Sequence, residues 1–393
     1  MQTSKGNKEL FPKNEYYALM LLTIGITALF IIRGSLFNYD WGDYTWFLKP
    51  WVTEYRGMTF FEGLGTKVGN YNPPYMYILN IIARSNFSDL YLIKVVSVIF
   101  DFLLAFFAMK IVSLKTSSIN FHVMTFLLIL AIPTVVLNSS MWGQCDSIYS
   151  AFALGSLYFG LKEKSKLTYV FIALAISFKA QAVFLLPMIP VFVFTNKIKL
   201  QDCYMFFAVY LATLLPAIIA GMPILTALLT YVDQANYFSQ LNMNLPNAWR
   251  FVDHVDYDSF RTVGLYVAGL AVFGLLFFTF IHKNRLSGLL DYVRLAYLFA
   301  IIMPFLLPKM HDRYYFLADV LSVLLFLYDK RRWYVPVVTV FCSYIAYAYF
   351  LMQGITLIDY RLAALALLIV IIIVLRDYVM SLYPDTTEAV QQS

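Results

Sequence analysis

The stretch that decides the fold class is Tyr17–Phe37, YALMLLTIGITALFIIRGSLF, which contains a single charged side chain, Arg33. Its length is about that of an α-helix that crosses the ~30 Å hydrocarbon core of a bilayer. Apolar runs of similar length recur as far as Arg376, so no room is left for a large soluble domain. The chain of 393 residues is 61% hydrophobic and 13% charged, whereas about a quarter of the residues in a soluble domain are charged. The sequence therefore predicts an all-α polytopic membrane protein.

Short basic groups between the apolar runs predict the topology, because Lys and Arg are enriched in cytoplasmic loops. Three lysines precede the first run, which places the N-terminal segment 1–16 in the cytoplasm and makes this run a signal anchor. Threading the remaining runs gives about 11–13 transmembrane helices and a cytoplasmic tail 377–393. The net charge of +6 does not indicate nucleic-acid binding, because the basic residues lie in these loops. The groups that this threading places in the cytoplasm are Lys5, Lys8 and Lys13; Lys110 and Lys115; Lys162, Lys164 and Lys166; Lys197 and Lys199; His282, Lys283 and Arg285; and Lys330, Arg331 and Arg332.

The first outer loop, 38–89, contains an apolar piece that is too short to span the bilayer. This piece begins at Pro73-Pro74 and ends at Ala83, which is about half of a spanning length. We expect a short re-entrant or interfacial helix there.

A second interruption lies at Lys179, where the short apolar runs Leu167–Phe178 and Ala180–Thr195 meet. A lysine in such a place either extends to the outer interface or binds an anion within a cavity. The spacing of a broken helix favours the cavity.

The outer ends of the helices carry most of the remaining ionisable residues. Such groups are costly near the membrane, so a cluster of them usually lines a wet cavity; the alternative is a set of ordinary interfacial anchors. Asp40 and Asp43, three residues apart, are candidates for a metal pair or a general base. The run Pro308–Tyr315 surrounds one carboxylate with Lys, His and Arg at a helix start, which suits a phosphate or an internally neutralised cluster.

Two ionisable residues within one span have a structural interpretation. Lys94 and Asp101 lie seven residues apart, hence on one helix face. We expect Asp101 to face a neighbouring helix and Lys94 to extend to the interface.

Six short motifs in the same order resemble the GT-C glycosyltransferases, polytopic enzymes that take a sugar from a polyprenyl-phosphate carrier. The resemblance covers about residues 38 to 315 and is greatest to the dolichyl-phosphate-glucose glucosyltransferases and mannosyltransferases and their bacterial relatives. The chain departs from the family pattern in having Asp rather than Glu after His311, and one inserted residue before Pro73. The motifs are Gly42-Asp43-Tyr44, Tyr71-Asn72-Pro73-Pro74-Tyr75, Trp142-Gly143-Gln144-Cys145-Asp146, Phe178-Lys179-Ala180-Gln181, Asn247-Ala248-Trp249 and His311-Asp312-Arg313-Tyr314.

The resemblance implies inverting transfer of a hexose from a polyprenyl-phosphate-sugar donor to a lipid-linked or cell-surface glycan acceptor. Catalysis would occur on the extracytoplasmic face of a plasma membrane, within a GT-C-like module 17–315 that is followed by C-terminal helices 316–376. Asp43 is the expected base, with Asp146 and Asp40 as alternates. The expected ligands of the donor phosphate are Lys179, His311, Arg313 and Arg250. The expected substrate-binding residues are Asp40, Tyr75, Trp142, Gln144, Asp146, Asn247 and Trp249.

No cofactor is expected, although a divalent metal at Asp40 and Asp43 stays open. Two other functions share this composition. A transporter or flippase for lipid-linked sugars also has broken helices, but it predicts internal repeats and charges near the midplane, whereas the polar residues here gather on the outer side. A polysaccharide polymerase would use a diphosphate-linked donor.

Overall fold

The computed structural model describes residues 13–237, 239–252, 256–286 and 288–383. Lys5, Lys8 and the end of the expected tail, 384–393, lie outside the described residues. The described chain is mostly helical, with two strands of two residues each. Its elements are α1 (Lys13–Leu36), η1 (Tyr44–Leu48), α2 (Lys49–Arg56), α3 (Phe60–Gly65), α4 (Pro73–Ile82), α5 (Asp89–Val112), α6 (Ile119–Ala131), α7 (Pro133–Val136), η2 (Leu137–Trp142), α8 (Asp146–Leu161), α9 (Ser165–Phe178), η3 (Ala180–Leu185), α10 (Met188–Phe194), η4 (Leu200–Cys203), α11 (Tyr204–Ile219), α12 (Ile224–Leu228), α13 (Thr230–Asn236), β1 (Asn242–Met243), η5 (Ala248–Phe251), α14 (Tyr257–Ile281), η6 (Lys283–Arg285), α15 (Leu289–Leu306), β2 (Met310–His311), α16 (Phe316–Tyr328), η7 (Lys330–Arg332), α17 (Tyr334–Leu351) and α18 (Tyr360–Ser381).

The all-α polytopic architecture is confirmed, with fewer full-length spans than expected. Within the described ranges, seven helices are long and apolar enough to cross a membrane, and the pair α6–α7, bent by 58°, raises this number to up to eight. The expected 11–13 also included α8, α9, α10 and α16, which have 16, 14, 7 and 13 residues. An α-helix needs about 20 residues to span the hydrocarbon core, so these four are too short to cross unaided.

Both interruptions expected from the sequence are present. Helix α4 has only ten residues and carries a proline in its first turn, where the missing N–H costs no hydrogen bond. At Lys179 the backbone is extended, with φ −154° and ψ 136°, between the end of α9 and the 3-10 helix η3. The side chain of Lys179 therefore leaves the chain at a true break between two helices.

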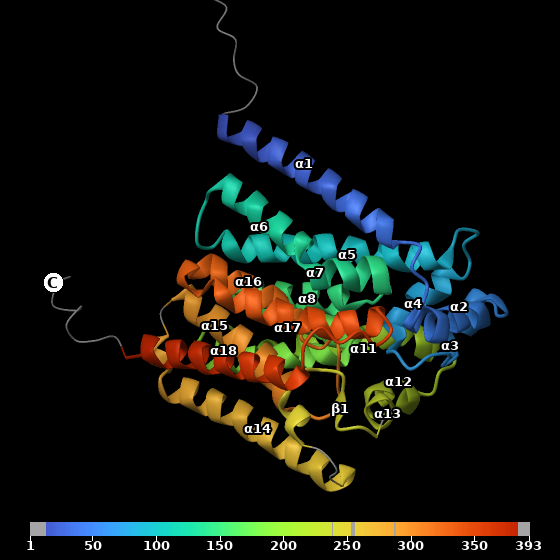
Figure 1. Cartoon of the computed structure of the whole chain (residues 1–393). Helices are drawn as coiled ribbons and strands as arrows, with labels where there is room; N and C mark the ends of the chain where they lie inside the picture. Colours follow the sequence, from blue (N-terminus) through green and yellow to red (C-terminus); the bar gives the residue numbers. More distant parts are fainter. Residues whose placement is uncertain (1–12, 238, 253–255, 287, 384–393) are drawn as a thin grey trace, which may run out of the picture.

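Different elements meet at the two ends of the bundle (Figure 1). Helices α2, α3 and α4 lie together at one end. The basic loops meet at the other end, where Arg332 pairs with Asp377, and Lys115 Nζ donates to the Tyr328 carbonyl at 2.7 Å. Arg285 belongs to the same end, because it donates to the Leu382 carbonyl. These contacts bring together loops that the sequence places in the cytoplasm, and which end of the bundle faces the cytoplasm stays a prediction.

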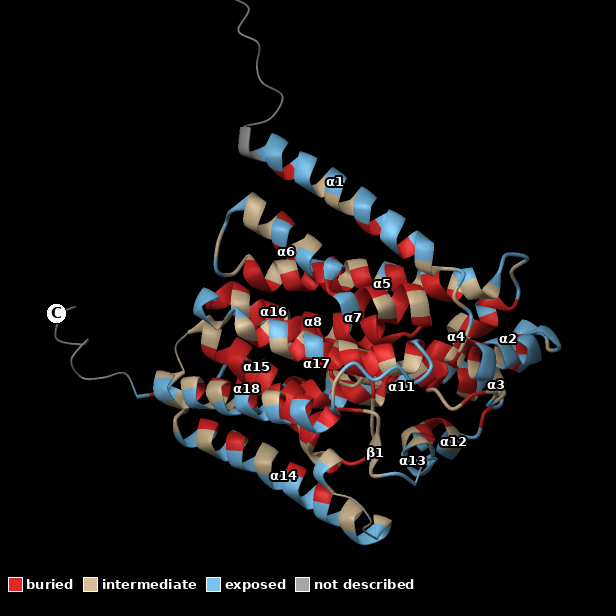
Figure 2. Ribbon diagram, in the orientation of Figure 1, coloured by how far each residue is buried: buried red, intermediate tan, exposed pale blue. Residues whose placement is uncertain are grey.

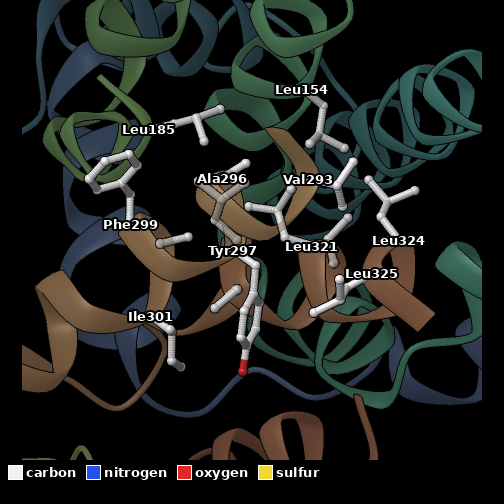
Figure 3. Close-up of a cluster of buried hydrophobic side chains, with 14 of the residues drawn as sticks. Leu154, Leu185, Val293, Ala296, Tyr297, Phe299, Ile301, Leu321, Leu324 and Leu325 are labelled. Atoms are coloured by element: carbon white, nitrogen blue, oxygen red, sulfur yellow. The ribbon is translucent and has the colours of Figure 1, made fainter. Parts of the chain in front are cut away.

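The core lies where α8, α15 and α16 meet. Figure 3 shows side chains of these helices packed on one another, including Leu154, Val293 and Leu321. Helices α1 and α14 run along the edges of the bundle with mostly exposed side chains (Figure 2), as expected of surfaces that face lipid. The core extends from Leu29 to Leu382, so the expected segments 17–315 and 316–376 share it.

Buried charges join α1 to its neighbours. Arg33 of α1 and Asp101 of α5 form an ion pair of 2.6 Å, and both side chains are fully buried. Asp101 also accepts hydrogen bonds from Ser139 and Ser147, so it faces its neighbours as predicted. The expectation that Lys94 extends to the interface is wrong. Its buried ammonium donates to the carbonyls of residues 36, 37 and 39, because these groups at the end of α1 have no partner within the helix.

The close approach of α8 to α10 supplies a test of the fold. A Cβ atom added at Gly160 would lie 2.2 Å from the Phe192 ring, whereas one added at Gly274 of α14 would meet nothing within 4 Å. We expect Gly160→Ala to lower the free energy of unfolding by about 1–3 kcal/mol, the usual cost of overpacking. The control Gly274→Ala should be neutral or stabilising, since Ala favours helices. Unfolding in detergent micelles compares them, and equal effects would contradict this packing.

Candidate functional site

A cavity of about 650 Å³ opens at the end of the bundle that carries α2, α3 and α4. Its walls come from the start of η1, the turn before α8, the break at Lys179, helices α13 and α14, and the loop 307–315. The wall combines charged and aromatic side chains with other residues. The charged lining residues are Asp43, Lys179, Arg261, Lys309, Asp312 and Arg313, and the aromatic ones include Trp46, Trp51, Tyr71, Tyr231 and Tyr314.

Asp43 is held at the cavity wall by the turn that precedes η1. Gly42 has φ +84°, a left-handed conformation that favours glycine, and a Cβ there would lie 2.8 Å from the Phe350 ring. The Gln144 side-chain amide donates to Asp43 Oδ2 at 2.5 Å, and Arg313 Nη1 lies 3.4 Å from the same oxygen. Gln144 is fixed in turn by the hydroxyl of Tyr71, which donates to it at 3.3 Å. Both partners of Asp43 use Oδ2, so Oδ1 of this cavity-lining residue has no hydrogen-bond or ion-pair partner among the described residues.

Asp146 and Lys179 form a buried ion pair behind this wall. Lys179 Nζ lies 2.5 Å from Asp146 Oδ1, and the two side chains are 2% and 1% exposed. Asn138 donates to the other carboxylate oxygen at 2.7 Å. Gly143, with φ +73°, lets the chain turn from η2 into α8 and brings Asp146 to this position. The break in the helix thus lets Lys179 both pair with Asp146 and line the cavity.

Arg313 links the charged groups. Its guanidinium lies 3.4 Å from Asp43, 3.6 Å from Asp146 and 3.8 Å from Asp312. The guanidinium also lies 5.2 Å from the ring centroid of Trp142, a cation–π contact. Burial alone would lower the pKa of Arg313. The neighbouring Asp43, Tyr71 and Asp146 outweigh this effect, and the pKa lies above its ordinary value. Arg313 therefore stays charged.

The loop that carries Arg313 is anchored by the short parallel pair β1–β2, in which Met243 lies opposite His311. Burial, with Arg313 and Lys179 nearby, lowers the pKa of His311 to about 3. The expectation that His311 adds a third cation is therefore not supported, although the imidazole can still form hydrogen bonds. Burial raises the pKa of Asp312 to about 7; Arg313 opposes this shift, and Asp43 adds to it.

The structure brings together five of the residues expected from the sequence at the cavity wall, namely Asp43, Gln144, Lys179, His311 and Arg313. Three more, Tyr75, Trp142 and Asp146, lie buried behind that wall. The ring centroids of Tyr75 and the lining residue Tyr71 lie 5.0 Å apart. The Trp142 ring stacks on the Phe350 ring with 4.3 Å between their centroids. Asp40 is exposed and outside the lining.

The Asn247-Ala248-Trp249 motif and Arg250 do not line the cavity. Asn247 caps η5 and donates to the Pro304 carbonyl, and the Trp249 indole N–H donates to the Leu306 carbonyl at 2.9 Å. Arg250 lies 4.5 Å from the ring centroid of Tyr360. These residues tie the segment before α14 to α15 and α18. His254, which follows them, lies outside the described residues.

Sequence reasoning missed most of the aromatic lining and one cation. Trp46, Trp51 and Tyr71 come from the first outer loop, where the density of aromatic residues was the available signal. Arg261 lies in the second turn of a lipid-facing helix, and no motif marks it. Among the described residues, it forms no ion pair within 4 Å and so offers an unpaired positive charge at the cavity.

Among the residues that the structure describes, Asp40 and Asp43 have no third metal ligand beside them. Over the described ranges, no three His, Cys, Asp or Glu side chains are grouped so as to hold a metal ion. The charged network instead pairs carboxylates with Lys179 and Arg313.

A search of protein-family models and a search of curated proteins both found no match to the chain.

Proposed function

We propose that this protein is an inverting glycosyltransferase that moves a hexose from a polyprenyl-phosphate-sugar donor to a glycan or glycolipid acceptor outside the cytoplasm. The observation that carries the proposal is the cavity at the end of the bundle, where one partly free carboxylate, Asp43, faces the same space as Lys179 and Arg313. The reaction needs these two kinds of group together: an acceptor for a proton and a stabiliser for a phosphate leaving group.

Asp43 would act as the base. A sugar hydroxyl is a poor nucleophile at neutral pH, so its proton must move to an acceptor as the new bond forms. Gln144 and Arg313 hold Oδ2, which orients the carboxylate and leaves Oδ1 for the hydroxyl. The hydroxyl oxygen attacks C1 of the donor sugar, its proton passes to Asp43, and C1 inverts as the C1–O bond to phosphate breaks.

Lys179 and Arg313 would stabilise the leaving polyprenyl phosphate. The bond electrons pass to a phosphate oxygen, so this group needs positive charge more than it needs a proton. A guanidinium can contact two phosphate oxygens, and His311, neutral at pH 7, could donate one hydrogen bond. Trp46, Trp51 and Tyr71 offer apolar ring faces to the sugars.

Lys179→Met tests the phosphate assignment. We expect it to weaken donor binding about 10- to 150-fold, the value of one charge-assisted hydrogen bond of about 1.5–3 kcal/mol. The measurement is the Kd of a fluorescent polyprenyl phosphohexose. The control Lys115→Met removes a lysine whose ammonium contacts the Leu327 and Tyr328 carbonyls at the opposite end of the bundle. Unchanged affinity in folded Lys179→Met would remove Lys179 from the phosphate site.

The proposal as a whole is tested by incubating the purified protein with radiolabelled polyprenyl-phosphate hexoses and a panel of glycolipid acceptors. We expect label to appear on an acceptor and free polyprenyl phosphate to be released in equal amount. Transfer only from polyprenyl-diphosphate sugars would indicate a polymerase instead. Movement of intact donor across vesicles without transfer would indicate a flippase.

A further inference from the structure

The loop residue Asp312 occupies an unusual position in the charged cluster. Its side chain is only 5% exposed and lines the cavity. Its Oδ1 lies 3.8 Å from Arg313, too far for a hydrogen bond, and has no hydrogen-bond partner among the described residues. A buried carboxylate oxygen without such a partner is costly when ionised. Asp312 is therefore the least stabilised carboxylate of the cluster.

The ion-paired cluster around Arg313 contains more acidic than basic groups; Lys309 and Arg261 line the same cavity, but among the described residues neither forms an ion pair with the carboxylates of this cluster. Asp43, Asp146 and Asp312 surround Arg313, and Lys179 is directly paired with Asp146. These three carboxylates thus face two fixed positive charges. His311 adds none at neutral pH, because burial together with Arg313 and Lys179 lowers its pKa to about 3.

A bound phosphodiester brings one more negative charge to this cluster. Like charges in a buried site favour the neutral form of the weakest acid among them. Asp146 keeps Lys179 and Asn138 as direct partners, and Asp43 keeps Gln144. Asp312 Oδ1 has no such partner among the described residues.

Several charged or titratable neighbours among the described residues bear on the protonation of Asp312. Burial raises the pKa of Asp312 to about 7, Arg313 opposes that rise, and Asp43 and Asp146 increase it. From α18, Tyr360 interacts with Asp312, and Arg250 lies over the Tyr360 ring.

We propose that Asp312 takes up one proton from solution when the phosphodiester of the donor binds beside Arg313, so that donor binding and protonation are coupled. This inference rests on the proposed function and specifies the charge state in which the site accepts its donor. Once neutral, Asp312 no longer competes for Arg313, and its new O–H can donate to a phosphate oxygen.

The pH dependence of donor affinity tests the coupling. The charge of a phosphodiester is constant between pH 6 and 9, so any change reports on the protein. Bound anion raises the pKa of Asp312 above its free value, so affinity should be constant below about pH 7 and fall by up to tenfold per pH unit above it. The probe is a short-chain polyprenyl phosphohexose, titrated by calorimetry. An affinity that stays flat from pH 6 to pH 9 in the unaltered protein would overturn the proposal.

Proton uptake gives a second readout that needs no variant. Calorimetry at pH 8 in two buffers of different ionisation enthalpy should detect nearly one proton taken up per donor bound. Asp312→Asn should bind donor with flat pH dependence and no proton uptake, whereas the exposed control Asp40→Asn should behave as the unaltered protein does. Binding without proton uptake in the unaltered protein refutes this inference alone. If no polyprenyl phosphohexose binds at any pH, the proposed function fails and this inference fails with it.

Discussion

Asp43→Asn should abolish hexose transfer while leaving a folded protein that still binds the donor. The amide keeps the size of the side chain and can still contact Gln144 and Arg313, but it cannot accept the proton of the acceptor hydroxyl. Loss of a general base typically lowers kcat by on the order of 10²–10⁴-fold. The measurement is the rate of label transfer at saturating donor and acceptor, with donor Kd measured in parallel.

The matched control is Asp40→Asn, three residues earlier in the same turn. Asp40 is exposed and does not line the cavity, so this variant should transfer sugar at close to the normal rate. The pair of variants separates Asp43 from Asp40, two of the three candidate bases that the sequence left open; the third is Asp146. Full activity of Asp43→Asn together with an inactive Asp40→Asn would reassign the base to Asp40.

Arg33→Met should produce the largest loss of stability of any change considered. It removes the positive partner of Asp101 and leaves that carboxylate buried between α1 and α5 with only serine hydroxyls as partners. Breaking one half of a buried ion pair typically costs about 3–5 kcal/mol. The expected result is a decrease of this size in the free energy of unfolding, measured by titration with SDS in mixed micelles.

Two further variants show that burial is the cause. Lys67 and Asp233 pair at the same distance of 2.6 Å, but their side chains are 34% and 59% exposed. Lys67→Met should therefore cost less than about 1 kcal/mol. The double variant Arg33→Met with Asp101→Leu should recover much of the loss, because an apolar pair replaces an unpaired charge. A loss for Arg33→Met no greater than that for Lys67→Met would contradict this explanation.

The sequence predicted the membrane fold and its interruptions because these depend on local hydropathy and on breaks in it. Tyr17–Phe37 and the short piece after Pro73 can be identified from composition and length alone. The number of spans could not be obtained this way. Helices such as α8 and α16 are apolar because they are buried within the bundle, and burial in protein resembles burial in lipid.

The candidate site was predicted in part. Asp43, Lys179 and Arg313 lie at breaks or turns where polar residues interrupt apolar runs, and these three meet at the cavity. Trp249, in contrast, lies in a similar break but packs against Gly264 of α14 and bonds to a backbone carbonyl. Only the direction of a side chain separates these cases, and sequence spacing within a loop does not give that direction.

The Lys94 prediction failed for a related reason. Lys94 lies near the end of a span, where lysine side chains in many membrane proteins extend to the interface. The carbonyls that it contacts lie at and just after the end of α1, more than fifty residues away in the chain. A partner on another helix cannot be inferred without knowing which helices are neighbours.

The order in which the cavity acquires its walls has a consequence for biogenesis. Asp43, Gln144 and Lys179 emerge early during synthesis, but Arg313 lies between α15 and α16, and Phe350 lies near the end of α17. Until these late segments enter the membrane, Asp43 has no guanidinium beside it and Trp142 has no ring stacked on it. Part of the cavity wall is therefore absent through most of translation, and a polypeptide that ends before residue 350 never completes it.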